Sequence, residues 1–276
     1  MSSIQKKWLY VTDVDTAREE VLECLPRMGK INYVDGWYGF GASAILRSIA
    51  EVLPYRKTTP ELCFDSVIFI DCSNWKNRRM MQRTIAEELE LDRSLMSILD
   101  EHDEDDDYSR VDESSRNEVD SVGKVIDQTL RDIKFMMIFL NGSDGYIDVG
   151  LLGIPPFARF GHNMMIWTFN RSLTMRQDYH EVVNKLRYTH GFINSCFYIK
   201  RLKRYQIWEL LHQEAASIVA RIPCMLDFNQ KMVENCCLYE LFLKHNFHIT
   251  SKLDWATHGS SYWICDGIIT RGHSKR

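Results

Sequence analysis

Eight consecutive residues, 36–43, have the types and spacing that could hold a phosphate group. Their sequence, GWYGFGAS, fits the phosphate-binding template G-x-x-x-x-G-K-[ST] at every fixed position except one, where Ala42 stands in place of the lysine. In a complete loop, the glycines let backbone N–H groups surround the phosphates, the lysine neutralises the outer phosphates, and the hydroxyl binds Mg²⁺. We therefore expect a backbone cradle without its cation. Its residues are Gly36, Gly39, Phe40, Gly41, Ala42, Ser43 and Ala44, with Ser43 as a weak Mg²⁺ ligand that acts only when a Mg-nucleotide binds.

The missing lysine is expected to weaken phosphate binding. Losing one charge-assisted hydrogen bond to phosphate costs about 1.5–3 kcal/mol, or about 10- to 150-fold in affinity. Lys30 is no substitute, because it precedes the loop mostly along a strand and so lies roughly 20 Å away. Arg47, one helical turn after Ser43, leaves two alternatives: it contacts a phosphate, or it is solvated or salt-bridged. The bulky Trp37 and Tyr38 could fill the emptied phosphate site.

The residues on either side of this loop predict a strand before it and a helix after it. The apolar run 31–34 is typical of a buried strand. After Gly41, apolar residues recur at helical spacing and predict an amphipathic helix over 43–53. A helix that begins at the loop adds its own N–H donors and the positive end of its dipole. Strand, loop and helix in this order are the context that a phosphate loop requires.

Four more apolar runs predict further strands of the same sheet. They cover 66–72, 134–141, 163–170 and 196–200, and helical patterns lie at 77–91, 113–132 and 205–222. Runs that are apolar at consecutive positions are expected where helices cover both faces of a parallel sheet. The sequence thus predicts an α/β fold, a doubly wound parallel sheet with helices on both faces. We expect a helical segment over 1–29, the α/β domain over 30–226, and a small helical subdomain over 227–276.

The composition excludes several classes of protein. With 45% apolar residues and no run of 18 apolar residues, the chain is expected to be globular and cytoplasmic, without a signal peptide or transmembrane segment. The eight cysteines include no C-x-x-C pair and predict reduced, mostly buried thiols. The segment 100–107 holds seven acidic residues and predicts a solvated loop, outside which the chain is nearly neutral. No basic cluster with interleaved aromatic residues is present, so no nucleic-acid partner is expected.

Several blocks, taken in order, resemble the NB-ARC nucleotide-binding module of plant NLR-type disease-resistance proteins. The glycine loop is followed by FDSVIFIDCS at 64–73 and MQRTIAEEL at 81–89, which are similar to the family's second strand and helix. LRDIKF at 130–135 leads into a third strand, and LGIP at 152–155 follows it. MIWTFNRS at 165–172 resembles the strand whose terminal arginine, here Arg171, senses the γ-phosphate.

Later blocks extend this resemblance, which covers about residues 20–270. MVENCCLY at 232–239 and YWICDGII at 262–269 resemble the start of the family's winged-helix subdomain. The resemblance implies a P-loop NTPase-like fold followed by a small helical, winged-helix remnant. It also implies that Pro223 stacks on the nucleotide base. Most of the family's helical bundle after Pro223 is missing, which should leave an apolar face exposed near Trp208 and Leu211.

The departures from the family pattern fall on the residues that carry its chemistry. In the family the third strand ends in two acidic residues that orient Mg²⁺ and water, but here it ends in Leu140 and Asn141. An apolar leucine cannot bind a cation. Asp144 and Asp148 follow in a polar loop and are typical turn formers.

These departures predict a non-catalytic protein that acts through protein contacts. Phosphoryl transfer depends on positioned cations, so no ATPase activity is expected without the lysine and the acid. The resemblance implies ADP or ATP, bound weakly or not at all, as the ligand, and immune receptors or signalling proteins of plant defence as partners; Mg²⁺ is not expected. Restoring lysine at Ala42 should raise nucleotide affinity if the cradle is intact. Two alternatives stay open: a genuine ADP/ATP switch with displaced catalytic groups, and a truncated product without its own role.

Overall fold

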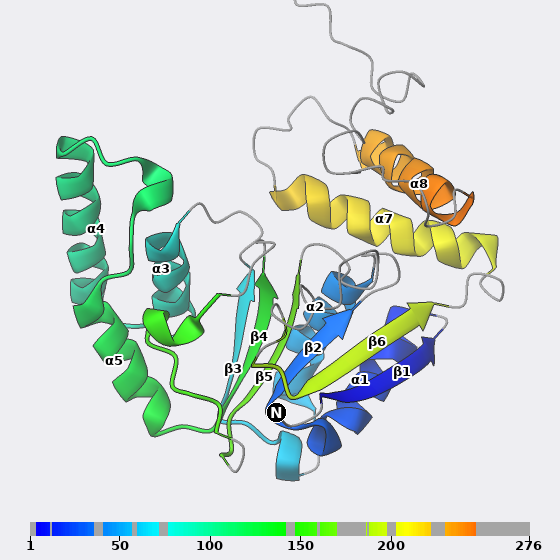
Figure 1. Ribbon diagram of the computed structural model, residues 1–276, viewed down its shortest axis with the longest axis horizontal. Coiled ribbons are helices and arrows are strands. Elements are labelled where there is room, and N and C mark those ends of the chain that lie inside the picture. Colours follow the sequence, from blue (N-terminus) through cyan, green and yellow to red (C-terminus); the bar gives the residue numbers. More distant parts are fainter. Residues whose placement is uncertain are drawn as a thin grey trace, which may run out of the picture.

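The computed structural model describes residues 4–11, 13–35, 41–56, 60–71, 77–141, 147–158, 161–169, 186, 188–197, 203–221 and 230–246. Within these ranges six strands form one sheet in which every neighbouring pair is parallel (Figure 1). They are β1 (Gln5–Val11), β2 (Ile31–Asp35), β3 (Ser66–Asp71), β4 (Phe135–Asn141), β5 (Met164–Phe169) and β6 (Gly191–Phe197). Their order across the sheet is β1-β6-β2-β5-β4-β3. The predicted α/β class with a parallel sheet is confirmed.

Helices cover both faces of the sheet. α1 (Val14–Met28) and α2 (Ala42–Val52) lead from β1 to β2 and from β2 to β3, toward the β3 edge, and both pack on one face. α3 (Arg78–Glu88), α4 (Arg93–Tyr108) and α5 (Asp120–Arg131) lead back from β3 to β4 and pack on the other face. The helices change to the other face of the sheet where the chain reverses its direction across the sheet, because crossovers between parallel strands are right-handed. Short 3₁₀ helices are η1 (Leu53–Tyr55), η2 (Pro60–Leu62), η3 (Glu113–Ser115) and η4 (Val149–Leu152).

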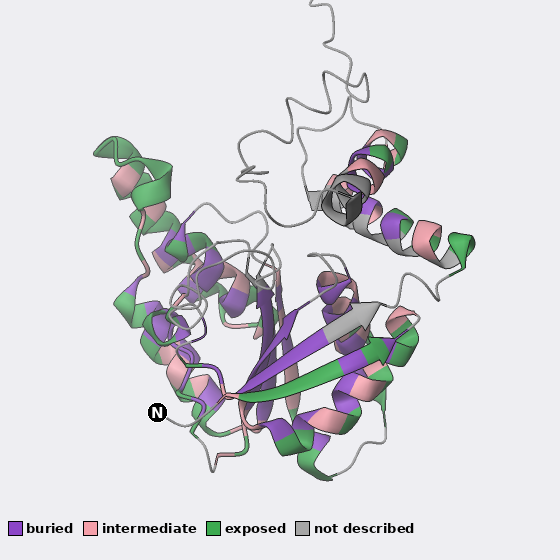
Figure 2. Ribbon diagram, turned by 45° about the vertical axis from the view of Figure 1, so that its right-hand side comes forward, coloured by how far each residue is buried: buried purple, intermediate pink, exposed green. Residues whose placement is uncertain are grey.

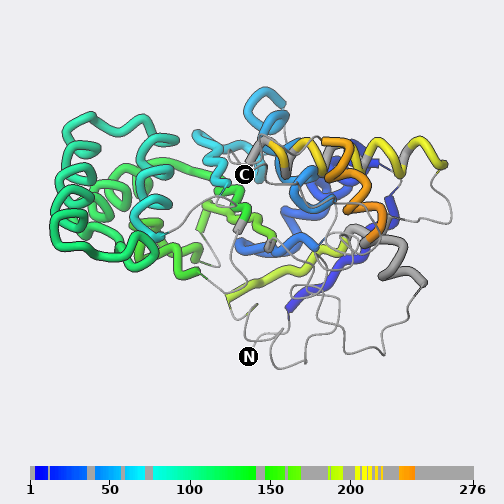
Figure 3. The backbone as a smooth tube through the Cα atoms, turned by 90° about the horizontal axis from the view of Figure 1, so that it is seen from above, coloured from blue at the N-terminus to red at the C-terminus, as the bar shows by residue number. Residues whose placement is uncertain are grey.

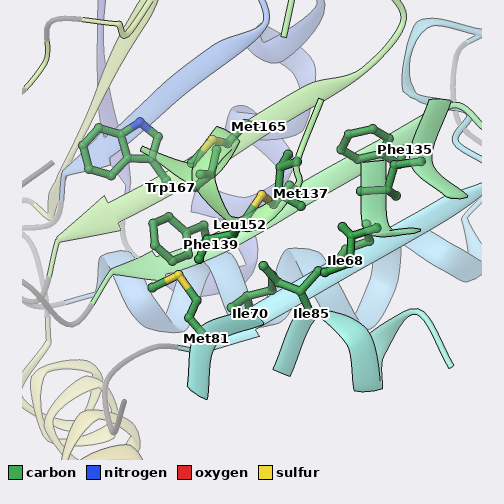
Figure 4. Close-up of a cluster of buried hydrophobic side chains, with 14 of the residues drawn as sticks. Ile68, Ile70, Met81, Ile85, Phe135, Met137, Phe139, Leu152, Met165 and Trp167 are labelled. Carbon is green, nitrogen blue, oxygen red and sulfur yellow. The ribbon is translucent and has the colours of Figure 1, made fainter. Parts of the chain in front are cut away.

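The core consists of one apolar layer on each face of the sheet. On β4, Ile138 and Leu140 belong to the layer that includes α1 and α2. Met137 and Phe139 point to the opposite face, where they pack in one cluster with Ile85 of α3 (Figure 4). Because side chains alternate along a strand, a strand covered on both faces needs apolar residues at consecutive positions. This requirement explains the uninterrupted apolar run of β4.

Two strands differ from the sequence-based prediction. The segment 1–29, predicted to be helical, begins with β1 at the edge of the sheet, followed by α1. In β1 only Leu9 and Val11 are buried, so the strand lacks the apolar run that marks the central strands (Figure 2). β6 begins at Gly191, earlier than the predicted strand 196–200, and its sequence GFINSCF mixes small, polar and apolar residues.

The acidic run 100–107 is helical, and its prediction as a loop is wrong. It forms the second half of α4, which begins where Asp92 accepts a hydrogen bond from the Ser94 N–H at 2.9 Å. Arginines of neighbouring segments neutralise the aspartates on one side of this helix. Arg79, whose side chain is only 8% exposed, lies 3.0 Å from Asp103 and 2.6 Å from Asp106. The further pairs are Arg83 with Asp100 and Asp103, and Arg116 with Asp103 and Asp107.

Two helices follow the sheet, α7 (Arg204–Arg221) and α8 (Gln230–Asn246), and they pack on each other (Figures 1 and 3). α7 agrees with the predicted helix 205–222, whereas α8 is one continuous helix where short pieces were predicted. Leu211 is fully buried in a small cluster with residues of α8. The apolar face predicted to be exposed near Trp208 and Leu211 is therefore covered at Leu211, whereas Trp208 is half-buried. The predicted boundary near Leu226 and the winged-helix segment after 246 lie outside the described residues.

Two further predictions concern membranes and thiols. No helix in the described ranges is long and apolar enough to cross a membrane. Of the free cysteines described, Cys236 and Cys237 are buried, Cys24 is half-buried and Cys63 is exposed. Burial raises the pKa of Cys24 to about 11. This thiol is therefore protonated and unreactive at neutral pH.

Candidate functional site

The candidate site lies at the carboxyl edge of the sheet, where β2 leads through the glycine loop into α2. β2 is flanked by β5 and β6, so the loop leaves from the interior of the sheet. The chain leaves β2 toward α2 on one face and leaves β4 toward η4 on the opposite face. Ligands of open α/β sheets bind outside the carboxyl ends of the strands, where connections diverge in this way.

Gly41 joins the glycine loop to the helix and adopts a left-handed backbone conformation, with φ of 86°. A residue with a Cβ is strained in this conformation, so the last glycine of the template is required here. The carbonyl oxygen of Gly41 accepts the Ile45 N–H at 2.9 Å and so begins the helical hydrogen bonding of α2. The N–H groups in the first turn of a helix point toward its N-terminal end, where helices of phosphate-binding proteins receive the phosphate.

The position of the missing lysine is enclosed by apolar side chains. Ala42 is 4% exposed and belongs to the apolar layer that α1 and α2 form with the sheet. Ser43 and Ala44 are half-buried. The side chain at position 42 therefore contributes to the core. The other predicted nucleotide-binding residues, Gly36, Gly39, Phe40, Arg171 and Pro223, lie outside the described residues, as do Trp37 and Tyr38.

The end of β4, where acidic residues were sought, is occupied by the core. Leu140 is 3% exposed and belongs to the same apolar layer as Ala42. Asn141 is the last residue of β4. Asp148 is a turn former, as predicted, because its carboxylate accepts the Gly150 N–H at 3.0 Å and begins η4. Asp144 lies outside the described residues.

Arg47 is salt-bridged, which was one of the two alternatives left open by the sequence. Its Nη2 lies 2.6 Å from Oδ2 of Asp71, the last residue of β3. The guanidinium carbon also lies 5.7 Å from the ring centroid of Phe69, within the range of a cation–π contact. Asp71 is in register with Leu140. The carboxyl edge therefore holds one acid beside the position of the missing acid, and a cation neutralises it.

Three buried polar residues at this edge were missed by the sequence analysis. Asp35, the last residue of β2, is 1% exposed and accepts a hydrogen bond from the Tyr33 hydroxyl at 3.4 Å. Asn194 of β6, its register partner, is 3% exposed, and Thr168 of β5 is 2% exposed. A polar residue near the end of an apolar strand is the signal that could have identified them, because burying a polar group is costly. Asp35 directly precedes the glycine loop.

The described residues offer hydrogen-bond donors at the start of α2, a buried acidic group before the loop, and an arginine that is already paired. Among the described residues, no group of three or more His, Cys, Asp or Glu side chains is placed to hold a metal ion. No protein-family model matches the chain, and no curated protein matches it.

Proposed function

We propose that the protein is a non-catalytic regulatory or interaction module with a P-loop NTPase-like core. By its motifs it resembles the NB-ARC module of plant immune receptors, and its role is in defence signalling through protein contacts. Binding of ADP or ATP is weak or lost. The proposal concerns a cytoplasmic protein whose partners are immune receptors or signalling proteins.

The arrangement of the strands supports the P-loop NTPase-like part of this proposal. The strand before the glycine loop lies inside a parallel sheet, and the loop is followed directly by a helix of 11 residues. Gly41 has the left-handed conformation that a tight strand-to-helix turn needs. A phosphate loop requires this context in addition to its sequence pattern.

The non-catalytic part of the proposal rests on one observation. The two positions at which the lysine and the acid are missing are buried among apolar side chains. Ala42 and Leu140 are both core residues of one apolar layer. Phosphoryl transfer needs positive charge at the phosphates. A lysine supplies it directly, and a metal ion supplies it when acidic residues hold and orient that ion. The nearby Arg47 and Asp71 neutralise each other at 2.6 Å.

A nucleotide switch with displaced catalytic groups is the second candidate. The buried carboxylate of Asp35 favours it, because this acid is the last residue of β2, directly before the glycine loop. In this case Asp35 or Asp71 would take over part of the role of the missing acid.

The nucleotide content of the purified protein separates these candidates. The protein is heated, the precipitate is removed, and the released nucleotides are quantified by chromatography. We expect less than about one tenth of a mole of ADP per mole of protein, because the site lacks one charged contact worth about 1.5–3 kcal/mol. Recovery of nearly one mole of ADP per mole of protein would favour the switch and overturn our proposal.

A further inference from the structure

β1 forms one edge of the sheet and carries exposed aromatic side chains (Figure 2). Among the described strands it is paired with β6 alone. Leu9 and Val11 point into the apolar layer that contains α1. Trp8 and Tyr10, which alternate with them along the strand, are 50% and 62% exposed. An exposed edge strand with apolar side chains is a template on which another strand can pair.

Every second residue of β1 directs its main-chain groups away from β6. The Gln5 N–H donates to the His190 carbonyl at 2.9 Å, so the odd-numbered residues of β1 direct their main-chain groups to β6. The N–H and C=O groups of Lys6, Trp8 and Tyr10 therefore point to the outer edge of the sheet. A strand that adds to this edge must form its hydrogen bonds with these three residues.

The opposite edge of the sheet, β3, is covered by side chains of its own chain. The carboxylate of Glu88, at the end of α3, accepts a hydrogen bond from the backbone N–H of Phe69. The ring of Phe69 also lies beneath the guanidinium group of Arg47. Covering an edge in this way prevents it from pairing with another chain. β1, which has neither proline nor glycine among its seven residues, is therefore the edge that is suited to pairing.

We propose that β1 pairs with β1 of a second copy of the chain, antiparallel and related by a twofold axis at Trp8. In this register Trp8 of one copy faces Trp8 of the other, and Lys6 faces Tyr10. All three residues that point outward then take part, in about six backbone hydrogen bonds. The two sheets become one continuous sheet, and the same patch of each copy forms the interface, as twofold symmetry requires.

The side chains of β1 are complementary to themselves in this register, which is why we assign the partner as a second copy. Lysines on an edge strand usually discourage pairing. Here Lys6 lies opposite Tyr10, where its ammonium group can contact the face of the ring, and Lys7 lies opposite Leu9. No lysine of β1 faces another lysine. A shift of the register by two residues toward the amino end would place Lys7 opposite Lys7 and lose about two backbone bonds.

The test is sedimentation equilibrium of the full chain over a range of concentrations. We expect the wild type to form a dimer whose share rises with concentration. Trp8→Lys and Trp8→Glu each place like charges opposite each other at the twofold axis, and each should raise the dimer Kd at least about tenfold. An equimolar mixture of these two variants should associate again, because each lysine then faces a glutamate. Tyr55→Lys is the matched control, at an aromatic side chain of η1 that is 90% exposed, and should leave the dimer unchanged.

Three outcomes would overturn the inference. A wild type that is monomeric at every concentration would leave the edge to a strand of a different protein. A dimer that persists in Trp8→Lys would show that the two copies meet at another surface. Failure of the mixture to associate would show that Trp8 does not face Trp8.

Circular dichroism and thermal melts check that each variant is folded. Lys6→Pro replaces a variant that is not, because it removes an N–H that points to the outer edge and keeps the ladder with β6. Dimerisation is measured without nucleotide, so its failure is distinct from failure of the proposed function.

Discussion

Ala42 stands where the phosphate-binding template has a lysine, and its side chain belongs to the apolar core. From the sequence alone, restoring the lysine is expected to raise nucleotide affinity. The structure adds a cost, because the Ala42 side chain is 4% exposed in the layer that α1 and α2 form with the sheet. A lysine there must either bury its amine or displace its neighbours.

We therefore expect Ala42→Lys to be less stable than Ala42→Met, a side chain of similar length without a charge. The difference should be about 1–3 kcal/mol in the free energy of unfolding, the cost of burying an unpaired polar group. Urea denaturation of both variants measures it. Equal stability of the two variants, together with tighter ADP binding by Ala42→Lys, would mean that position 42 opens toward the phosphates.

At the scale of elements, His190 joins the starts of three strands. Its Nδ1 accepts hydrogen bonds from the backbone N–H groups of Lys30 and Ile31, each at 3.2 Å. Its backbone N–H donates to the Ile31 carbonyl at 2.8 Å, and its carbonyl accepts the Gln5 N–H at 2.9 Å. Gly29 makes room for the ring, since a Cβ at this position would lie 2.8 Å from the Cβ of His190. β1, β2 and β6 are thus aligned at their amino ends by one residue.

This arrangement predicts a cost for removing the ring. Without an acceptor at this position, the backbone N–H groups of Lys30 and Ile31 lose the hydrogen bonds that they donate to Nδ1.

In His190→Asn the amide oxygen can replace Nδ1 as the acceptor, whereas His190→Ala leaves both donors without it. We expect the free energy of unfolding of His190→Ala to be about 1–3 kcal/mol lower than that of His190→Asn, the cost of leaving donors unpaired. Urea denaturation of both variants measures the difference. His102→Ala and His102→Asn, at an exposed position of α4, serve as the control pair. The prediction is wrong if His190→Ala and His190→Asn are equally stable.

At the scale of the whole molecule, α7 and α8 form a small unit with its own core. Leu211, Ala215, Val233 and Cys237 form a cluster separate from the two large layers of the sheet. Glu234, which is 6% exposed, lies 3.0 Å from Lys231 and 2.7 Å from His212. Segments with small cores open more readily than the rest of a protein.

We expect backbone amides of α7 and α8 to exchange hydrogen faster than those of β4. Glu234→Gln should accelerate exchange in these two helices at neutral pH and leave β4 unchanged, because it removes the charge shared by Lys231 and His212. Hydrogen exchange followed by mass spectrometry measures both segments. Glu104→Gln, at an exposed position of α4, is the control. Equal acceleration in β4 would mean that the molecule opens as one unit.

The same carboxylate makes the stability of the α7–α8 unit depend on pH. The hydrogen bond from Lys231, with a further one from His212, holds the pKa of Glu234 below its usual value of 4.5. A carboxylate with a lowered pKa stabilises the folded state above the unfolded value, and this stabilisation is lost as the pH falls through the folded value. In acid, below pH ~4.5, the α7–α8 unit should therefore loosen before the sheet.

A sequence-based prediction was right where local patterns decide the structure, and wrong where contacts between distant parts of the chain decide it. The strand β4 and the helix α2 were predicted because each carries a continuous or periodic apolar pattern within a few residues. β1 was missed because an edge strand buries only Leu9 and Val11, and tertiary pairing with β6 decides its conformation. The acidic run was placed in a loop because the arginines that neutralise it, Arg79 among them, come from other segments of the chain.

The sequence by itself determined the parallel α/β class, the glycine pattern that has Ala42 in place of a lysine, and the apolar residue at the end of β4. These features depend on residue types and short spacings, which are local. Only the tertiary structure decided that Ala42 is part of the core, that Arg47 pairs with Asp71, and that α8 covers Leu211. Each of these contacts joins residues that are distant in the chain, and close packing of the elements brings them together.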